Sequence, residues 1–184
     1  MSLTYENYPP LKNMALAAVK AGKTTGYPPI VLLAQWSAES DWGRKVTGDY
    51  NFWGIKAVPP APCNLCPTTE DLTPEEFAEM RADERATVTK IEPLGNGLNR
   101  YHMSCWFASY PSFDASVIAY IEFILTNSRY HPAWVQYQAT KDTDEFIKGI
   151  ARAGYATSPE YEQLLLTLAN QQNLIHAVAM ARES

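Results

Sequence analysis

Apolar residues recur every three or four positions over most of this chain, which is the spacing that places them on one face of a helix. The pattern is interrupted in the middle, where residues 47–67 are rich in Gly, Pro, Asn and aromatic residues and predict a loop. Helices are predicted over 11–21, ending near Gly22, over 28–41, from Ser112, from Pro132, from Thr143 to Gly154, and from Ser158-Pro159 to about Ala181.

Two short strands and one polar helix are predicted in the middle of the chain. Residues 86–92 and 99–108 have the composition of strands, and the turn at Gly95-Asn96-Gly97 contains the Asn-Gly pair that favours a tight hairpin. The sequence Thr73-Pro74-Glu75-Glu76 is a capping box, which predicts a helix that extends to about Glu84.

These elements together predict the fold class. The chain has 184 residues, which is enough for one domain with its own core. We expect a predominantly helical α+β fold, a single domain over 1–184, with a small β-containing lobe inserted at about 58–106. A cleft between the helical body and this lobe is where we expect an active site, with Glu39 on the helical side.

Charge and composition narrow the classes of function. The net charge of −5 and the lack of a Lys/Arg cluster argue against a nucleic-acid groove. No apolar run approaches the ~20 residues that span a bilayer. The first residues, MSLTYENYPP, lack the basic and apolar regions of a signal peptide, so we expect export by another route or after removal of a leader. The 11 Tyr, 6 Phe and 5 Trp residues suit a sugar-binding cleft, although such rings also fill cores.

Glu39 is the candidate catalytic acid. It lies near the end of an apolar helix, on the same face as Leu32, Gln35 and Trp36. Loss of hydration and the negative end of the helix dipole both disfavour the anion, so its pKa should be raised. A carboxylic acid that is still protonated near neutral pH can protonate the leaving oxygen of a glycosidic bond. The alternative is an ordinary solvated glutamate at a helix end.

The segment around Glu39, LLAQWSAESDWGR followed by NFWGIKA, resembles the signature of glycoside hydrolase family 73, the N-acetylglucosaminidases of the flagellar and autolysin type. Three later segments are similar to the family in the same order: CPTTE at 66–70, WFASYPS at 106–112, and Arg129-Tyr130 followed by AGYATSPEY at 153–161. The resemblance extends over roughly residues 10–170. It implies a lysozyme-like α+β fold and hydrolysis of the GlcNAc-β-1,4-MurNAc bond of peptidoglycan.

The resemblance also implies roles for single residues. Glu39 corresponds to the general acid, and Glu70 matches the glutamate of the family's T-x-E, the expected second carboxylate. Tyr155, in the G-Y-A-T segment, is implied as a catalytic helper that orients substrate or water. Glu92, at the mouth of the predicted hairpin, is the rival second carboxylate. The stretch 71–99 is longer than the family's hairpin and contains an additional helix, a departure that affects the position of both glutamates. A third possibility is that the acetamido group of the substrate acts as an internal nucleophile.

Several aromatic and amide residues are candidates for binding the sugar. Those that we expect to contact substrate are Trp42, Asn51, Trp53, Tyr130 and Tyr161. For Phe52, packing of the loop under the helical body is the better interpretation.

The cysteines suggest a possible structural role in the inserted lobe. Cys63, Cys66, His102 and Cys105 are residue types that zinc binds, but His102 and Cys105 should point to opposite faces of a strand. A disulfide from Cys105 to Cys63 or Cys66, or free thiols, are the alternatives. We expect no cofactor and no metal in the active site.

The sequence therefore predicts an endo-β-N-acetylglucosaminidase that binds peptidoglycan glycan strands as a monomer and acts on the cell wall, outside the cell or in the periplasm. One alternative is a lytic transglycosylase, which needs only one acid. Such enzymes usually have a G-L-M-Q-like run after the glutamate, where this chain has NFWGIKA. Another alternative is a non-catalytic cell-wall-binding or phage-tail structural domain.

Overall fold

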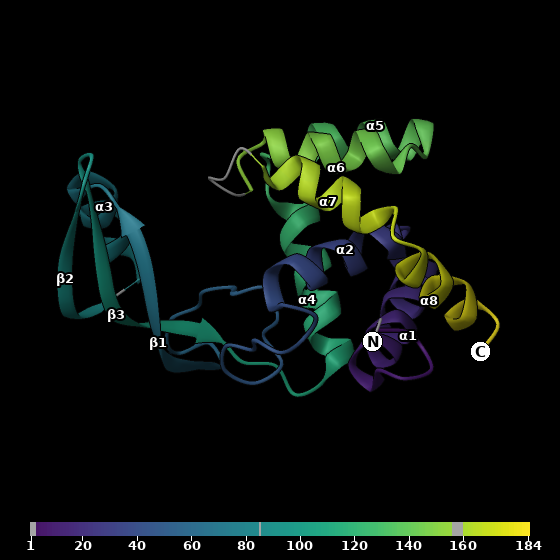
Figure 1. Ribbon diagram of the computed structural model, residues 1–184, viewed down its shortest axis with the longest axis horizontal. Coiled ribbons are helices and arrows are strands. Elements are labelled where there is room, and N and C mark those ends of the chain that lie inside the picture. Colours follow the sequence, from purple (N-terminus) through teal and green to yellow (C-terminus); the bar gives the residue numbers. More distant parts are fainter. Residues whose placement is uncertain (1–2, 85, 156–159) are drawn as a thin grey trace. The chain divides into compact units, whose positions relative to one another are not determined.

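A computed structural model describes residues 3–84, 86–155 and 160–184 of the chain (Figure 1). Within these residues there are eight helices and three strands: α1 (Pro9–Thr25), α2 (Pro29–Ser40), β1 (Cys63–Leu72), α3 (Pro74–Glu84), β2 (Thr87–Gly95), β3 (Leu98–Ala108), α4 (Phe113–Thr126), α5 (His131–Thr140), α6 (Thr143–Arg152), α7 (Tyr161–Ala169) and α8 (Gln172–Arg182). The expectation of a mainly helical α+β fold is confirmed.

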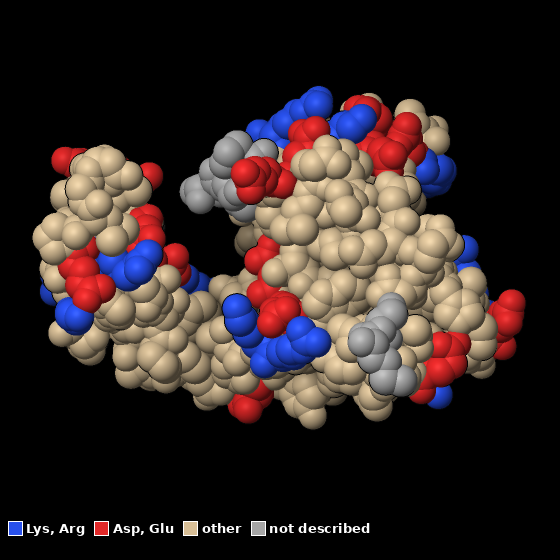
Figure 2. Space-filling view, in the orientation of Figure 1, with Lys and Arg blue, Asp and Glu red and all other residues tan. Residues whose placement is uncertain are grey.

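The chain forms two compact units. Met1–Lys45 and Ser112–Ser184 make one unit, which we call the helical unit, and Val46–Pro111 make the other, which we call the sheet unit. Every described helix is too short or too polar to cross a bilayer. On the face shown in Figure 2, Lys and Arg side chains lie in small groups beside Asp and Glu, in keeping with the modest negative net charge.

Helix α2 forms the centre of the helical unit and packs against α1, α7 and α8. Eight of its twelve residues are buried, including Trp36, which is fully enclosed. The helix begins at Pro29, whose fixed φ suits the first turn. It stops because Asp41, Trp42 and Gly43 all have positive φ (48°, 60° and 79°). At Gly43 a Cβ atom would lie 2.7 Å from the Trp36 ring, so only glycine fits there.

Helix α1 is longer than the sequence predicted, because Gly22 lies inside it rather than at its end. The helix continues to Thr25 and is closed by Gly26 in the left-handed conformation (φ 77°). A Cβ at Gly22 would lie 2.8 Å from the carbonyl oxygen of Tyr27. Gly22 therefore allows the Tyr27 carbonyl to lie close to the backbone of α1. The prediction that the helix ends near Gly22 was wrong.

The C-terminal helix expected up to Ala181 is in fact two helices, α7 and α8. The side chain of Asn170 donates to the Leu166 carbonyl at 2.9 Å, and Gln171 is extended (φ −71°, ψ 131°), so the chain turns between them. The expected start at Ser158-Pro159 lies outside the described residues.

Helix α6 starts as expected, but its cap is a different residue. Asp142, not Thr143, is the N-cap, and its carboxylate accepts from the backbone N–H groups of Asp144 and Glu145, both at 3.0 Å. The predicted cap of α4 is confirmed, because the Ser112 hydroxyl accepts from the Ala115 N–H.

The sheet unit contains an antiparallel sheet in the order β1-β3-β2. The Asn96-Gly97 hairpin is confirmed, with φ of 49° and 82°, and so is the capping box, in which Thr73 and Glu76 bond each other's backbone N–H. Strand β1 was not predicted, and it begins inside the expected loop. The two edge strands of the sheet each contain a proline, Pro67 in β1 and Pro93 in β2.

Alternate residues of β3 face the helix α3 and form the core of this unit. Tyr101, Met103, Cys105 and Phe107 are buried there, and the ring of Phe77 on α3 stacks on Tyr101 with centroids 4.0 Å apart. Figure 1 shows α3 lying beside the strands. We call this the covered face of the sheet, and the other side the opposite face.

We predict that Gly22→Ala lowers the free energy of unfolding by about 1–3 kcal/mol, because the added Cβ would push against the Tyr27 carbonyl. At an ordinary exposed helical position the same change stabilises by about 1 kcal/mol. Urea unfolding measures the difference, with the exposed neighbour Lys23→Ala as control. If Gly22→Ala were more stable than the parent, the close contact between residue 22 and the Tyr27 carbonyl would be contradicted.

Candidate active site

Glu39 lies in the last turn of α2 and is half-buried. Leu32, Gln35 and Trp36, which the helical period places on its face, are fully buried. The hydroxyl of Tyr161 donates a hydrogen bond to Oε1 of Glu39 at 2.7 Å. Tyr161 is the first residue of α7, so the packing of α7 against α2 brings together two residues that are 122 positions apart.

Burial raises the pKa of Glu39, and the hydrogen bond from Tyr161 opposes that rise only in part. The direction is the one predicted from the sequence. Because the net effect favours the protonated form, the carboxyl group can keep a proton closer to neutral pH than a solvated glutamate does. This is the property required of a general acid.

Three tyrosine rings form a connected series that begins at Glu39 with Tyr161. Tyr155 stacks on Tyr161 with centroids 5.4 Å apart and an interplanar angle of 15°, and Tyr130 lies 6.0 Å from Tyr155. Burial, followed by the negative charge of Glu39, raises the pKa of Tyr155 well above its usual value, so this hydroxyl stays protonated. The structure therefore brings Glu39, Tyr130, Tyr155 and Tyr161 into one cluster, which we call the tyrosine cluster.

Two tyrosines, one in this cluster and one beside it, have contacts that the sequence did not reveal. Tyr161 was expected to contact the sugar, which stays a prediction, and in the structure its hydroxyl bonds Glu39 directly. Tyr120 was missed: it is fully buried on α4, and its ring meets Tyr155 edge-on at 6.4 Å. The signal for Tyr120 was a polar ring inside an apolar helix, since a buried tyrosine hydroxyl needs a partner.

Tyr130 is buried, so it packs inside the protein and offers little surface to a sugar. Only 2% of it is exposed, and the guanidinium of Arg129 lies 5.9 Å from the centre of its ring. The same guanidinium donates to the Gly154 carbonyl at 3.2 Å. Arg129 and Tyr130 thus fix the turn at Gly154 that leads into Tyr155.

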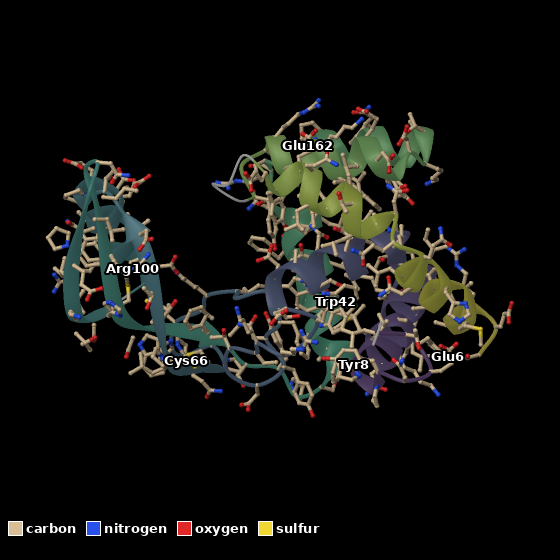
Figure 3. All side chains as sticks on the ribbon, in the orientation of Figure 1. Glu6, Tyr8, Trp42, Cys66, Arg100 and Glu162 are labelled. Atoms are coloured by element: carbon tan, nitrogen blue, oxygen red, sulfur yellow. The ribbon has the colours of Figure 1, made fainter. Side chains whose placement is uncertain are left out.

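Trp42 lies two residues after the end of α2. Its carbonyl accepts a hydrogen bond from the Tyr8 hydroxyl at 2.8 Å, and its ring meets Trp36 edge-on at 6.4 Å (Figure 3). The residue is half-buried, so part of its ring surface remains available to a ligand. Its predicted contact with sugar stays a prediction.

The remaining sugar-binding candidates belong to the loop of the sheet unit and are buried. The Asn51 amide donates to the carbonyls of Ile55 (2.8 Å) and Ala108 (3.0 Å) and accepts from the Ile55 N–H (3.0 Å). Both of its N–H bonds are therefore used to hold the loop, and we assign Asn51 a structural role. Phe52 and Trp53 are about as deeply buried, 5% and 6% exposed, and their rings meet edge-on at 5.9 Å.

The two rival carboxylates lie on opposite faces of the sheet. Glu70 on β1 pairs with Tyr101, which belongs to the covered face, whereas Glu92 on β2 pairs with Arg100 on the opposite face. Glu70 forms a long ion pair with Lys56 at 3.9 Å. The hydrogen bonds of Glu92 to Lys90 and then His102 lower its pKa to about 2. A carboxylate with so low a pKa is a weak base, so Glu92 is the poorer candidate.

The cysteine and histidine residues do not form a zinc site in the described part of the chain. Cys66 lies directly opposite Cys105 on the covered face, while Cys63 alternates to the other side of β1. His102 is on the opposite face, where it bonds Glu92 at 3.0 Å. All three cysteines are free thiols. Within residues 3–84, 86–155 and 160–184, no three potential metal ligands converge.

Comparison with known proteins gives one family. A family model described as mannosyl-glycoprotein endo-β-N-acetylglucosaminidase matches residues 15–174. The chain is similar to the peptidoglycan hydrolase FlgJ of Vibrio parahaemolyticus (30% identity, covering 85% of this chain and 44% of that protein) and of Pseudomonas aeruginosa (28% identity, 93% and 38%). It thus spans less than half the length of these relatives.

Solved structures are similar in fold. The catalytic domain of the autolysin Auto from Listeria monocytogenes aligns with a TM-score of 0.66 and 20% identity, covering 96% of this chain and 89% of that one. The glycoside hydrolase domain of FlgJ from Salmonella typhimurium aligns with a TM-score of 0.61 and 23% identity, covering 89% and 95%. The lysozyme-like α+β fold expected from the sequence is confirmed.

We predict that Asn51→Ala lowers the free energy of unfolding by about 1–3 kcal/mol, because it removes the hydrogen bonds that the Asn51 amide makes with the Ile55 N–H and the Ala108 carbonyl. Asn64→Ala is the matched control, since its amide bonds Asp49 near the surface and water can replace that bond. Urea unfolding of both variants measures the effect. Equal stabilities, together with a raised KM for Asn51→Ala, would instead support contact with sugar.

Proposed function

The chain belongs to the mannosyl-glycoprotein endo-β-N-acetylglucosaminidase family, and we propose that it hydrolyses the GlcNAc-β-1,4-MurNAc bond of peptidoglycan with Glu39 as the general acid. The relatives named peptidoglycan hydrolase support this choice of substrate. We also propose that it binds glycan strands as a monomer and acts at the cell wall, in the periplasm or outside the cell.

One observation carries the proposal. Glu39 is half-buried at the end of α2, inside the segment that matches the family, and burial raises its pKa. In the reaction the carboxyl proton passes to the glycosidic oxygen as the bond to the anomeric carbon breaks. A raised pKa keeps the acid protonated and ready near neutral pH. The rate should therefore fall as the pH rises through the pKa of Glu39.

For the second carboxylate we propose Glu70. It is partly exposed, and its ion pair with Lys56 is long, so it can accept a proton from an attacking water molecule. The strong hydrogen bonds that lower the pKa of Glu92 make that residue a poorer base. If neither glutamate is needed, attack by the acetamido group of the substrate remains as the route.

We predict that Glu39→Gln abolishes turnover, because an amide cannot donate the proton. Its melting temperature should stay close to that of the parent, since the Gln oxygen can still accept from Tyr161. The measurement is the release of soluble fragments from purified peptidoglycan, with mass spectrometry of their ends. Glu122→Gln, at an exposed position on α4, is the matched control and should retain full activity.

The fragment ends also separate the possible functions. Reducing N-acetylglucosamine ends support the proposal, and anhydromuramic ends indicate a lytic transglycosylase. No release by the parent chain indicates a binding or structural domain. Retained activity in Glu39→Gln contradicts the role of Glu39.

We predict that Glu70→Gln reduces kcat about 100-fold or more, while Glu92→Gln changes it less than threefold. Each variant makes the same change, Glu to Gln, at one position, and the two positions lie on opposite faces of the same sheet. Each variant therefore serves as the control of the other. The reverse order would assign the second carboxylate to Glu92. Near-parent activity in both would favour the acetamido route.

A further inference from the structure

The hydrogen bond between Tyr161 and Glu39 involves one carboxyl oxygen. The Tyr161 hydroxyl lies 2.7 Å from Oε1 of Glu39 and is the donor. In a protonated carboxyl group the carbonyl oxygen is the better acceptor, and the other oxygen carries the proton. A donor fixed at Oε1 therefore makes Oε1 the carbonyl oxygen and Oε2 the oxygen that holds the acidic proton.

Tyr161 is well suited to act as a fixed donor. Burial, followed by the neighbouring Tyr155 and Glu39, raises the pKa of its hydroxyl far above the usual value, so it stays protonated. Its ring is 8% exposed and stacks on Tyr155. Because Tyr161 is the first residue of α7, the packing of α7 on α2 also fixes its backbone. The hydroxyl consequently has little freedom to leave Glu39.

We propose that Tyr161 is a positioning residue, which holds Oε1 of Glu39 by its hydroxyl group and leaves Oε2 to deliver the proton to the glycosidic oxygen. The inference rests on the proposed role of Glu39 as the general acid. It assigns to Tyr161 a function different from the sugar contact expected from the sequence.

The same bond assists the transfer itself. The proton moves from Oε2 to the glycosidic oxygen, the bond from that oxygen to the anomeric carbon breaks with its electron pair going to the oxygen, and Glu39 is left as a carboxylate. A hydrogen bond to a charged acceptor is stronger than one to a neutral acceptor. The bond from Tyr161 therefore becomes stronger as the proton leaves, which lowers the barrier.

The effect of the Tyr161 hydroxyl on the pKa of Glu39 can be measured separately from the effects of other groups. Its titration is governed by burial, which raises the pKa, and by the Tyr161 hydrogen bond, which lowers it. The other titratable neighbour is Tyr155, whose hydroxyl stays neutral. Helices α1 and α8 also pack on α2. Among the described residues, no charged side chain of these two helices contributes to the shift of the Glu39 pKa. Removing the Tyr161 hydroxyl should thus raise the pKa of Glu39.

The test is Tyr161→Phe, which keeps the ring that stacks on Tyr155 and removes only the hydroxyl. With ¹³C-labelled glutamate, and the Glu39→Gln spectrum for assignment, NMR titration of the whole chain measures the Glu39 pKa directly. We expect this pKa to rise, kcat to fall about 10- to 100-fold with little change in KM, and the basic limb of the pH–rate profile to move to higher pH.

Tyr137→Phe is the matched control, because it removes a hydroxyl from a ring that is also 8% exposed but lies in the cluster around Trp134 and Phe146. It should leave the Glu39 pKa and the rate unchanged. Replacing Tyr161 by 3-fluorotyrosine keeps the fold and makes the hydroxyl a stronger donor, so it should lower the Glu39 pKa. This second variant decides the question if Tyr161→Phe does not fold.

An unchanged Glu39 pKa in both Tyr161 variants would overturn the inference and reduce Tyr161 to a packing role, while an inactive Glu39→Gln would still support the proposed function. Conversely, an active Glu39→Gln would overturn the proposed function, and the titration would still report whether Tyr161 controls the carboxyl group.

Discussion

The enclosure of α2 by α1, α7 and α8 is the constraint on which the helical unit depends. Glu39 is the only ionisable residue of this helix, and it lies where the buried face ends and the backbone turns into the left-handed region. Because its neighbours along the helix are apolar or fully buried, water can solvate the carboxyl group only in part. The same packing places a tyrosine hydroxyl against it, so one helix contact determines both the environment and the orientation of the acid.

Signals that operate over three or four residues could be read from the sequence. The capping box at Thr73, the cap at Ser112 and the Asn96-Gly97 turn each satisfy their own neighbours, so local chemistry was enough. The contact between Glu39 and Tyr161 joins residues 122 positions apart, and only the tertiary packing creates it. Gly22 was misread for the same reason, since its function is to leave room for a carbonyl five residues later.

The aromatic residues illustrate how residue type alone can mislead about function. Trp53 and Tyr130 were candidates for contact with the sugar, but the structure buries both, and Phe52, which was expected to pack, is buried as well. Of Trp36, Trp42 and Trp53, the tryptophans in the segments LLAQWSAESDWGR and NFWGIKA, only Trp42 keeps part of its surface accessible. The abundance of rings therefore reflects two uses, the filling of cores and a hydrogen bond to the Glu39 carboxyl group, and composition cannot separate them.

The prolines at the two edges of the sheet have a consequence for the behaviour of the chain in solution. An outer strand offers unpaired backbone groups to any other molecule that can add a strand beside it. Pro67 and Pro93 each lack the N–H that such an addition needs, and they stand near exposed apolar side chains, Leu65 and Ile91. Pro67 and Pro93 thus interrupt strand-by-strand association between molecules, which is a safeguard against aggregation.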